Sequence, residues 1–184
     1  MLDPMISFDD FLTAAPDIAG PVLDRLTSTG IGLLGTVRRD GSPRVSPVEV
    51  GLHDGRLALG MMPGSAKLAD VRRDPRACLL TPVADRTATG GEGKLFGRIE
   101  EVRGGDADRL LRARVDRLDG VELEDLAASP VFELRIGAAA WQHVDGDAWD
   151  TRSWSVGSPV RHRRREGATG EAVDVGDDRA EGGR

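Results

Sequence analysis

The sequence predicts a mainly β protein built around an antiparallel barrel in Greek-key or meander order. Two tight turns, Asp40-Gly41 and Asp54-Gly55, separate stretches of strand-like alternation, which is typical of hairpins. Segments with helical spacing are few and lie between these strands. A doubly wound sheet would need more helical sequence for its crossovers than the hairpins leave, so the barrel is favoured.

The elements of the first half follow from periodicity and from turn residues. Apolar residues three and four apart predict helices at residues 8–15 and 18–27, and Gly30 ends the second. Residues 31–38 are apolar or small on both faces, as in a barrel wall. The two turns then place strands at 43–52 and 56–62. Ser65 is the expected N-cap of a short helix, and Asp74-Pro75 ends it because a residue before proline avoids the helical region.

The second half continues the same pattern. Strands at 76–83 and 94–102 flank a polar, glycine-rich loop at 84–93. Helical spacing returns at 106–118, and 120–129 is irregular or a short helical turn. A long strand at 131–144 turns through Asp145-Gly146-Asp147 into a last strand at 148–155.

Length and composition indicate one domain with a polar tail. The 184 residues are 39% hydrophobic and 30% charged, which fits a single domain at residues 1–155. The remainder, 156–184, is rich in Gly, Asp, Glu and Arg, and we expect it to be mostly disordered after about Arg165. The single cysteine, Cys78, fits a reducing cytosol, and no apolar run approaches the ~18 residues of a membrane span. We expect a cytoplasmic protein with no membrane partner.

The net charge argues against nucleic-acid binding, and the placement of the histidines argues against a metal site. The net charge of −6 argues against nucleic acid as a partner, although the basic run 161–165 is a local exception. The histidines His53, His143 and His162 are far apart and have no cysteine or carboxylate at ligand spacing, so no metal site is expected. The motifs of common nucleophilic and nucleotide-dependent enzymes are missing as well. A reaction here would need a bound cofactor.

Ser46-Pro47 is the first candidate site, because proline cannot donate to a strand ladder and the pairing must break nearby. The freed peptide groups would suit a flat heterocycle with polar atoms along one edge. Arg44 lies on the same face as Ser46 by the two-residue period and would reach an anionic group on such a ring. The alternative is an edge strand on which Pro47 prevents aggregation.

Ser65 and Lys67 form the second candidate site. A lysine in the first turn of a helix opposes the macrodipole, so an anion is expected beside it. The Ser65 hydroxyl, the Lys67 ammonium and the first backbone N–H groups would together bind a phosphate. The alternative is an ion pair between Lys67 and Asp70.

The aromatic residues give a weaker signal. The tryptophans Trp141, Trp149 and Trp154 all lie in the last two expected strands, and core packing is the expected role for most of them. Trp154, which precedes the basic run, is the best candidate to face a ligand. Cys78 lies in an apolar strand, where a core position is more plausible than a nucleophilic one.

Three runs carry a resemblance to a known family: "TVRRDGSPRVSPVEVGLHDGRLAL", "GSAKLADVRRDPRACLL" and "GKLFGRIEEV". The ordered set resembles the pyridoxamine 5'-phosphate oxidase-like family, the FMN-binding split barrels. The resemblance implies a six-stranded antiparallel barrel and a homodimer with a flavin in each of two clefts at the interface. It also implies cofactor-binding roles for a set of residues. Arg44, Lys67 and Ser65 would hold the phosphate; Val45, Ser46, Pro47, Gly60 and Met61 would lie along the isoalloxazine; Lys94 would reach across the dimer; and Trp154, Arg161 and Arg164 would contact flavin and substrate.

The function implied is an oxidoreductase that moves a hydride to or from a small organic substrate through FMN or the deazaflavin coenzyme F-420. No catalytic side chain is assigned, since the ring performs the chemistry. The run "RHRRR" stands where a true pyridoxamine phosphate oxidase has R-L-H-D-R, which argues against vitamin B6 chemistry. The alternatives are a non-catalytic protein that binds or stores flavin or haem, and an interaction module with no chromophore.

Overall fold

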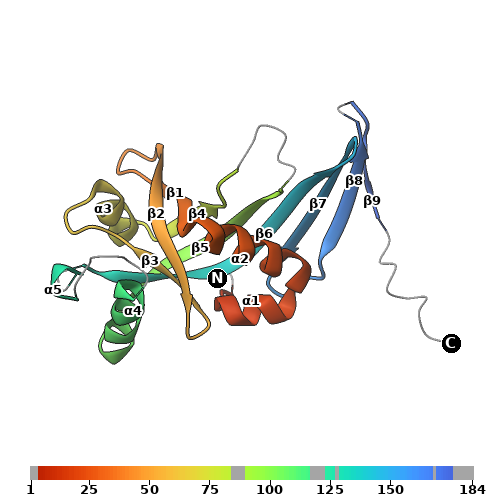
Figure 1. Ribbon diagram of the computed structural model, residues 1–184. Coiled ribbons are helices and arrows are strands. Elements are labelled where there is room, and N and C mark those ends of the chain that lie inside the picture. The colour runs from red at the N-terminus through yellow and green to blue at the C-terminus, as the bar shows by residue number, and fades with distance from the viewer. Residues whose placement is uncertain (1–3, 84–89, 117–122, 127–128, 168, 176–184) are drawn as a thin grey trace.

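The computed structural model describes residues 4–83, 90–116, 123–126, 129–167 and 169–175 (Figure 1). The elements in chain order are α1 (Phe8–Ala14), α2 (Pro16–Thr29), β1 (Ile31–Val37), β2 (Pro43–His53), β3 (Arg56–Gly60), α3 (Ala66–Arg73), β4 (Arg76–Leu80), β5 (Glu92–Val102), α4 (Gly105–Val115), α5 (Leu123–Leu126), β6 (Val131–Asp145), β7 (Ala148–Ser155), β8 (Arg161–Glu166) and β9 (Ala172–Asp174).

Six strands close into an antiparallel barrel, which confirms the predicted fold class. The hydrogen-bonded order is β3-β2-β1-β4-β5-β6, and pairing of β3 with β6 closes the ring. Strand β6 is 15 residues long and continues past the barrel. Its second half pairs with β7, and β8 and β9 extend the sheet further, as the right-hand side of Figure 1 shows. The molecule is therefore a barrel with a sheet extension that shares β6.

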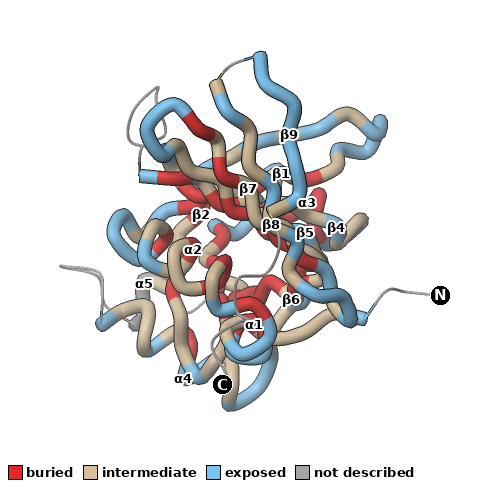
Figure 2. The backbone as a smooth tube through the Cα atoms, turned by 90° about the vertical axis from the view of Figure 1, so that its right-hand side faces the viewer, coloured by how far each residue is buried: buried red, intermediate tan, exposed pale blue. Residues whose placement is uncertain are grey.

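The core fills the barrel and the space under the first two helices. Buried segments gather in the middle of the molecule (Figure 2), while the turns between strands are exposed. On β1 the inward residues alternate with exposed ones, so Leu34 is fully buried and Leu33 is 37% exposed. The largest buried side chains are Phe8, Phe11, Ile18, Leu26, Leu34, Leu57, Leu59, Met61, Leu79, Leu95, Leu134 and Ile136.

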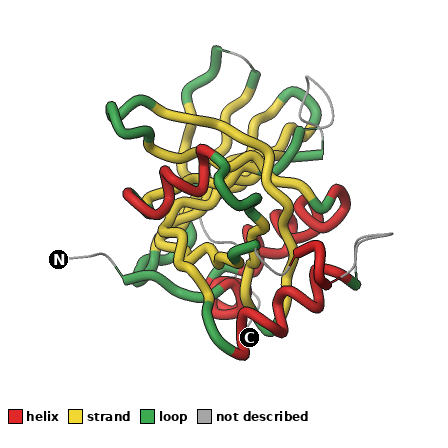
Figure 3. The backbone as a smooth tube through the Cα atoms, turned by 90° about the vertical axis from the view of Figure 1, so that its left-hand side faces the viewer, coloured by secondary structure: helices red, strands yellow, loops and turns green. Residues whose placement is uncertain are grey.

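Helices α1 and α2 confirm the two N-terminal predictions with small shifts of boundary. Ser7 accepts a hydrogen bond from the Asp10 backbone and completes a capping box, an arrangement worth about 1 kcal/mol. Proline at the first position starts α2, and Gly30 ends it with φ of 67°, a conformation that glycine adopts without strain. Figure 3 shows the helices around the strands. None of the helices in the described ranges is long and apolar enough to cross a bilayer.

Several predicted elements differ in length from the observed ones: β3 ends at Gly60 instead of residue 62, and β5 begins at Glu92 instead of residue 94. Strand β4 ends at Leu80 instead of residue 83. Its pairing with β5 closes through Thr81, which exchanges bonds with Gly93, and the following Pro82 has no N–H to continue the ladder. Helix α4 ends at Val115, and residues 117–122 of the predicted helix and turn lie outside the described residues. The same holds for residues 84–89 of the predicted loop.

Regular structure continues further along the C-terminal segment than the sequence predicts. Strand β8 pairs with β7 over six residues, and β9 pairs with β8 over three. Backbone pairing satisfies these strands although their side chains are largely charged, which is why an apolar pattern did not reveal them. Residues 176–184 lie outside the described residues. The division of the chain at residue 155 stays a prediction.

Candidate cofactor-binding site

Pro47 lies where one side of β2 is open. Pairing with β1 is continuous across it, since Leu33 opposes Pro47, whereas pairing with β3 begins only at Glu49. The N–H and C=O of one residue point to the same side of a strand. The Pro47 carbonyl points to the open side, where it accepts a hydrogen bond from the Lys67 ammonium at 2.5 Å. The missing N–H of Pro47 therefore removes no hydrogen bond between β1 and β2. The predicted break in pairing exists only on the side of β2 that faces β3.

Lys67 thus joins the start of α3 to the open stretch of β2, so the first and second candidate sites lie side by side. It makes no ion pair with Asp70 among the described residues, so the alternative interpretation of Lys67 does not hold. Partial burial lowers the pKa of the Lys67 ammonium, and the nearby Glu49 carboxylate opposes that shift. A cation that is partly stripped of water favours an anion beside it.

Ser65 precedes α3 at the N-cap position but caps nothing. Its backbone is extended, with φ of −67° and ψ of 149°, and its side chain makes no capping bond. The hydroxyl oxygen is buried and has no hydrogen-bond partner among the described residues. A buried hydroxyl costs free energy unless it forms a hydrogen bond. It is the orphaned polar group that a bound phosphate would satisfy.

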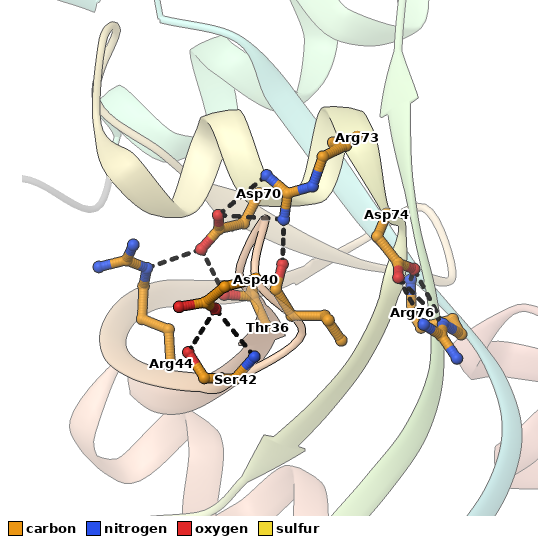
Figure 4. Close-up of polar contacts among 9 residues, drawn as sticks. Thr36, Asp40, Ser42, Arg44, Asp70, Arg73, Asp74 and Arg76 are labelled. Carbon is orange, nitrogen blue, oxygen red and sulfur yellow. Dashed lines mark hydrogen bonds and ion pairs between the residues drawn. The ribbon is translucent and has the colours of Figure 1, made fainter.

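Arg44 is held in place by Asp70, which is 4% exposed and lies on α3. Its Nε donates to Asp70 at 2.6 Å, and the same carboxylate accepts from Thr36 and Arg73 (Figure 4). The Arg44 hydrogen bond, reinforced by Thr36 and Arg73, lowers the pKa of Asp70 in spite of its burial. The terminal amino groups of Arg44 point away from Asp70 and bond to none of the described residues. They are free to donate to a ligand.

The arrangement fits a phosphorylated ring. We call Arg44, Pro47, Ser65 and Lys67 the cradle: two cations, one unsatisfied hydroxyl and an open strand edge. Beside it the surface is apolar, since Val45 is 65% exposed and Met62 is 73% exposed. Ser46 follows Val45 on the same stretch of β2. Charged donors at one end and an apolar surface at the other are what an anionic, planar cofactor requires.

Two of the residues predicted along the ring have other surroundings. Met61 is 1% exposed, so its side chain belongs to the core. Gly60 is covered by Arg114 of α4, whose guanidinium lies so close that a Cβ on Gly60 would be 2.7 Å from Cζ. The sequence placed Gly60 correctly in the strand, whereas Met61 lies just after the end of β3, and no pattern indicated what covers them.

The remaining predicted residues are not brought to the cradle within one chain. Lys94 is on β5, separated from β2 by β1 and β4, and pairs with Glu92. Trp154 is 6% exposed and packs against Phe11 at 5.2 Å between ring centroids, so it lies in the core and not toward a ligand. Arg161 and Arg164 are on β8 at the far side of the extension. Arg161 pairs with Asp174, and Arg164 bonds Asp150 at 2.6 Å.

Sequence reasoning missed Asp70 as the residue that positions Arg44, and it missed Glu49 and Arg114 beside Gly60. Asp70 was visible only as a helical neighbour of Lys67, and the spacing did not reveal its contact with β2. The link between Arg114 and Glu49 spans 65 positions, which no local pattern reports. Cys78 faces outward opposite Phe96, and burial raises the pKa of its thiol, which makes it a poor nucleophile.

Comparison with known proteins agrees with this fold. A family model described as pyridoxamine 5'-phosphate oxidase matches residues 21–144. No curated protein matches the sequence.

Several solved structures share the architecture. A haem-binding protein from Mycobacterium smegmatis is 22% identical with a TM-score of 0.59, and the match covers 73% of this chain and 57% of that one. A Clostridium acetobutylicum protein related to general stress protein 26, of the pyridoxine phosphate oxidase family, is 15% identical with a TM-score of 0.55 and coverages of 80% and 96%. HutZ, the haem storage protein from Vibrio cholerae, is 15% identical with a TM-score of 0.53 and coverages of 67% and 89%.

At these identities the solved structures report the fold alone. The family model is more specific, because it spans well over half of the sequence, from within α2 to near the end of β6, and so includes every cradle residue. The chain therefore belongs to the pyridoxamine 5'-phosphate oxidase family.

Proposed function

We propose that the protein is a flavin- or deazaflavin-dependent oxidoreductase that binds FMN, or else coenzyme F-420, at the cradle and acts on a small organic substrate. The proposal is carried by three groups that α3 connects. Lys67 bonds the Pro47 carbonyl on the open edge of β2, Asp70 holds Arg44 with its terminal amino groups free, and the Ser65 hydroxyl is buried without a partner among the described residues. When bound, the ring supplies hydride transfer. The chain's own residues bind its phosphate and orient it, and no side chain is assigned a proton-transfer role.

The cofactor would lie between two copies of the chain. The outer face of the barrel carries a band of exposed or half-buried apolar residues, which includes Val45, Leu33 and Phe96, at 65%, 37% and 44% exposure. An apolar band of this kind on a protein surface is typical of an interface. In such a homodimer Lys94, Arg161 or Arg164 of the second copy would complete the site. We propose a cytoplasmic location, in keeping with the free thiol of Cys78.

A titration tests the cofactor assignment. The purified protein is titrated with FMN and with F-420 and followed by absorbance and by quenching of ring fluorescence. In the double variant Arg44→Ala/Lys67→Ala we expect affinity to fall by a factor on the order of 100 or more, because two charge-assisted bonds are lost. The matched control is Arg38→Ala/Arg39→Ala, which removes two exposed cations from the β1–β2 turn. Equal affinity of the double variant and the wild type would refute the phosphate site.

The oligomer has its own test. Phe96→Glu places a charge in the middle of the apolar band, and we expect it to convert a dimer into a monomer in sedimentation or light scattering. Ala14→Glu, on an exposed site of α1, serves as a control for the added charge. A wild type that is monomeric at high concentration with cofactor present contradicts the interface.

A second candidate function is haem binding without turnover. The fold is shared with the haem-binding and haem storage proteins described above. His162 is the residue that favours it, since its Nε2 bonds the buried Asp150 and its other ring nitrogen is left for a ligand. Haem titration and a turnover assay distinguish the two. A Soret band that disappears in His162→Ala supports haem, whereas repeated turnover of bound flavin or deazaflavin with a reductant and an electron acceptor supports the oxidoreductase.

A further inference from the structure

Arg114 of α4 occupies an unusual position for a cation. Its side chain is only 12% exposed, and two of its nitrogens, Nε and Nη1, are buried with no partner among the described residues. The third, Nη2, donates to the Glu49 carboxylate. The absence of a side chain at Gly60 makes room for the guanidinium. A buried guanidinium with unmade bonds costs stability, so packing alone does not account for it.

Glu49 is the residue that Arg114 neutralises, and it lies beside the cradle. It stands two positions after Pro47 on β2, on the same outward face and roughly 7 Å along the strand. Lys67 donates to the Pro47 carbonyl two residues before Glu49, and its ammonium is within electrostatic reach of this carboxylate. Glu49 also opposes Gly60 in the β2–β3 register. Arg114 therefore lies over the Glu49–Gly60 pair, at the open end of the cradle.

The three side chains form a row of alternating charge: Arg114, Glu49 and Lys67. Without Arg114, the Glu49 carboxylate would act on Lys67 alone and would repel a second anion brought to Lys67. With Arg114, the charge of Glu49 is balanced from the opposite side. Pro47 and Glu49 are about 7 Å apart along the strand. Over a distance of this order, and with partial burial, one uncompensated charge changes the affinity for an anion by roughly tenfold.

We infer that Arg114 is a positioning residue for the phosphate site: it holds and neutralises Glu49, so that the cradle accepts the phosphate of a cofactor. This inference rests on the proposed function, but it concerns a residue outside the cradle. Arg114 touches neither Lys67 nor Arg44 in the described contacts and acts through Glu49.

The first test is a double-mutant cycle on FMN affinity, with Arg114→Met, Glu49→Gln and both together. Arg114→Met exposes the Glu49 charge, and we expect FMN to bind more weakly, on the order of tenfold. Glu49→Gln alone should not weaken FMN. The double variant should return toward the wild-type affinity, since the ion pair is removed as a whole and no uncompensated charge remains. Arg114→Lys keeps the cation and should restore most of the loss.

Riboflavin provides the ligand control, because it has the ring without the phosphate. Its affinity should be unchanged across the same variants. Arg56→Met provides the protein control, since Arg56 also pairs with a buried carboxylate, Glu133, but lies at the opposite end of β3. Equal losses for FMN and riboflavin in Arg114→Met, or a loss that persists in the double variant, would show a packing role and overturn the inference.

The second test needs no ligand and separates this inference from the proposed function. The chain has only two lysines, Lys67 and Lys94, so carbon-labelled lysine gives two assignable NMR signals, with Lys94→Arg identifying them. In the free protein we expect the Lys67 pKa to rise in Arg114→Met, to fall in Glu49→Gln and to return toward the wild-type value in the double variant. If wild type binds no flavin, the proposed function fails while this cycle still decides the charge coupling. An unchanged Lys67 pKa in both single variants overturns the coupling.

Discussion

At the scale of single residues, the candidate site depends on Asp70, whose carboxylate holds the side chain of Arg44 in place. Asp70 is buried on α3, yet its carboxylate fixes Arg44 of β2 and receives Thr36 of β1. One carboxylate therefore joins three elements before any ligand arrives. The residue types and spacings around Lys67 predict an anion site, which stays a prediction. They were insufficient to predict Asp70, because its role depends on which face of α3 is turned toward the barrel.

Ser65 gives the sharpest single-residue prediction. Because its hydroxyl caps no backbone group and bonds to no described residue, Ser65→Ala should not lower the free energy of unfolding in urea. The same variant should bind FMN more weakly, by roughly tenfold for one lost hydrogen bond to a charged group. Ser7→Ala, at the working cap of α1, is the comparison and should cost about 1 kcal/mol of stability. Loss of stability in Ser65→Ala without loss of affinity would contradict this.

Asp74 gives a prediction in pH. Hydrogen bonding to Arg76 lowers the pKa of its carboxyl from 3.8 to about 2 (Figure 4). A folded-state pKa below the unfolded value means that the stabilisation is present above about pH 4 and is lost as pH falls toward 2. The difference in Tm between wild type and Asp74→Asn should therefore be constant at neutral pH and shrink over that window. A difference that grows on acidification would contradict the pairing.

At the scale of elements, the hairpins were predictable and the C-terminal strands were not. Asp40-Gly41 and Asp54-Gly55 mark turns whose φ values, 85° at Gly41 and 71° at Gly55, glycine accepts without strain. Strand β8, "RHRRRE", has no apolar alternation, and its order depends on backbone pairing and on Asp150, which bonds His162 and Arg164. The two-residue period does not show which face of β7 is inward. For this reason the sequence predicts that Trp154 faces a ligand, whereas it lies in the core.

Two glycine substitutions, one in β5 and one in α2, should change the free energy of unfolding in opposite directions. A bulge between Phe96 and Gly97 bends β5, and a Cβ on Gly97 would overlap the Arg135 carbonyl oxygen on β6. Gly97→Ala should destabilise the protein by about 2 kcal/mol or more. Gly20, inside α2, has nothing within 4 Å of a Cβ, so Gly20→Ala should stabilise by about 0.5–1 kcal/mol. Urea unfolding of the pair measures both, and the same sign for both would be inconsistent with the bulge.

At the scale of the molecule, the barrel carries the cradle and the extension carries a separate ionic cluster. Asp150 is 5% exposed and is balanced by His162 and Arg164 of β8. The sequence predicted the barrel because alternation and turns are local signals. The joining of the barrel to the extension through one strand is a long-range property, and no local pattern predicted it.

Truncations distinguish the contributions of the last two strands. Ending the chain after Gly167 removes β9, whose three residues are exposed, and should cost less than about 1 kcal/mol. Ending it after Ser155 removes β8 as well and leaves the Asp150 carboxylate buried without His162 or Arg164, which should cost about 3 kcal/mol. Asp150→Asn in the shorter chain should recover part of that loss. Equal thermal stability of the two truncated proteins would contradict the role of β8.

Strand β6 sets the order in which the structure can open. Its amides are enclosed by β5 and by β3 or β7 along most of its length, whereas β9 has a partner on one side only. Backbone protons of β6 should therefore be the last to exchange with deuterated solvent, and those of β9 among the first. Protection would then decline strand by strand outward from β6, so that the far end of the sheet frays while the barrel stays closed.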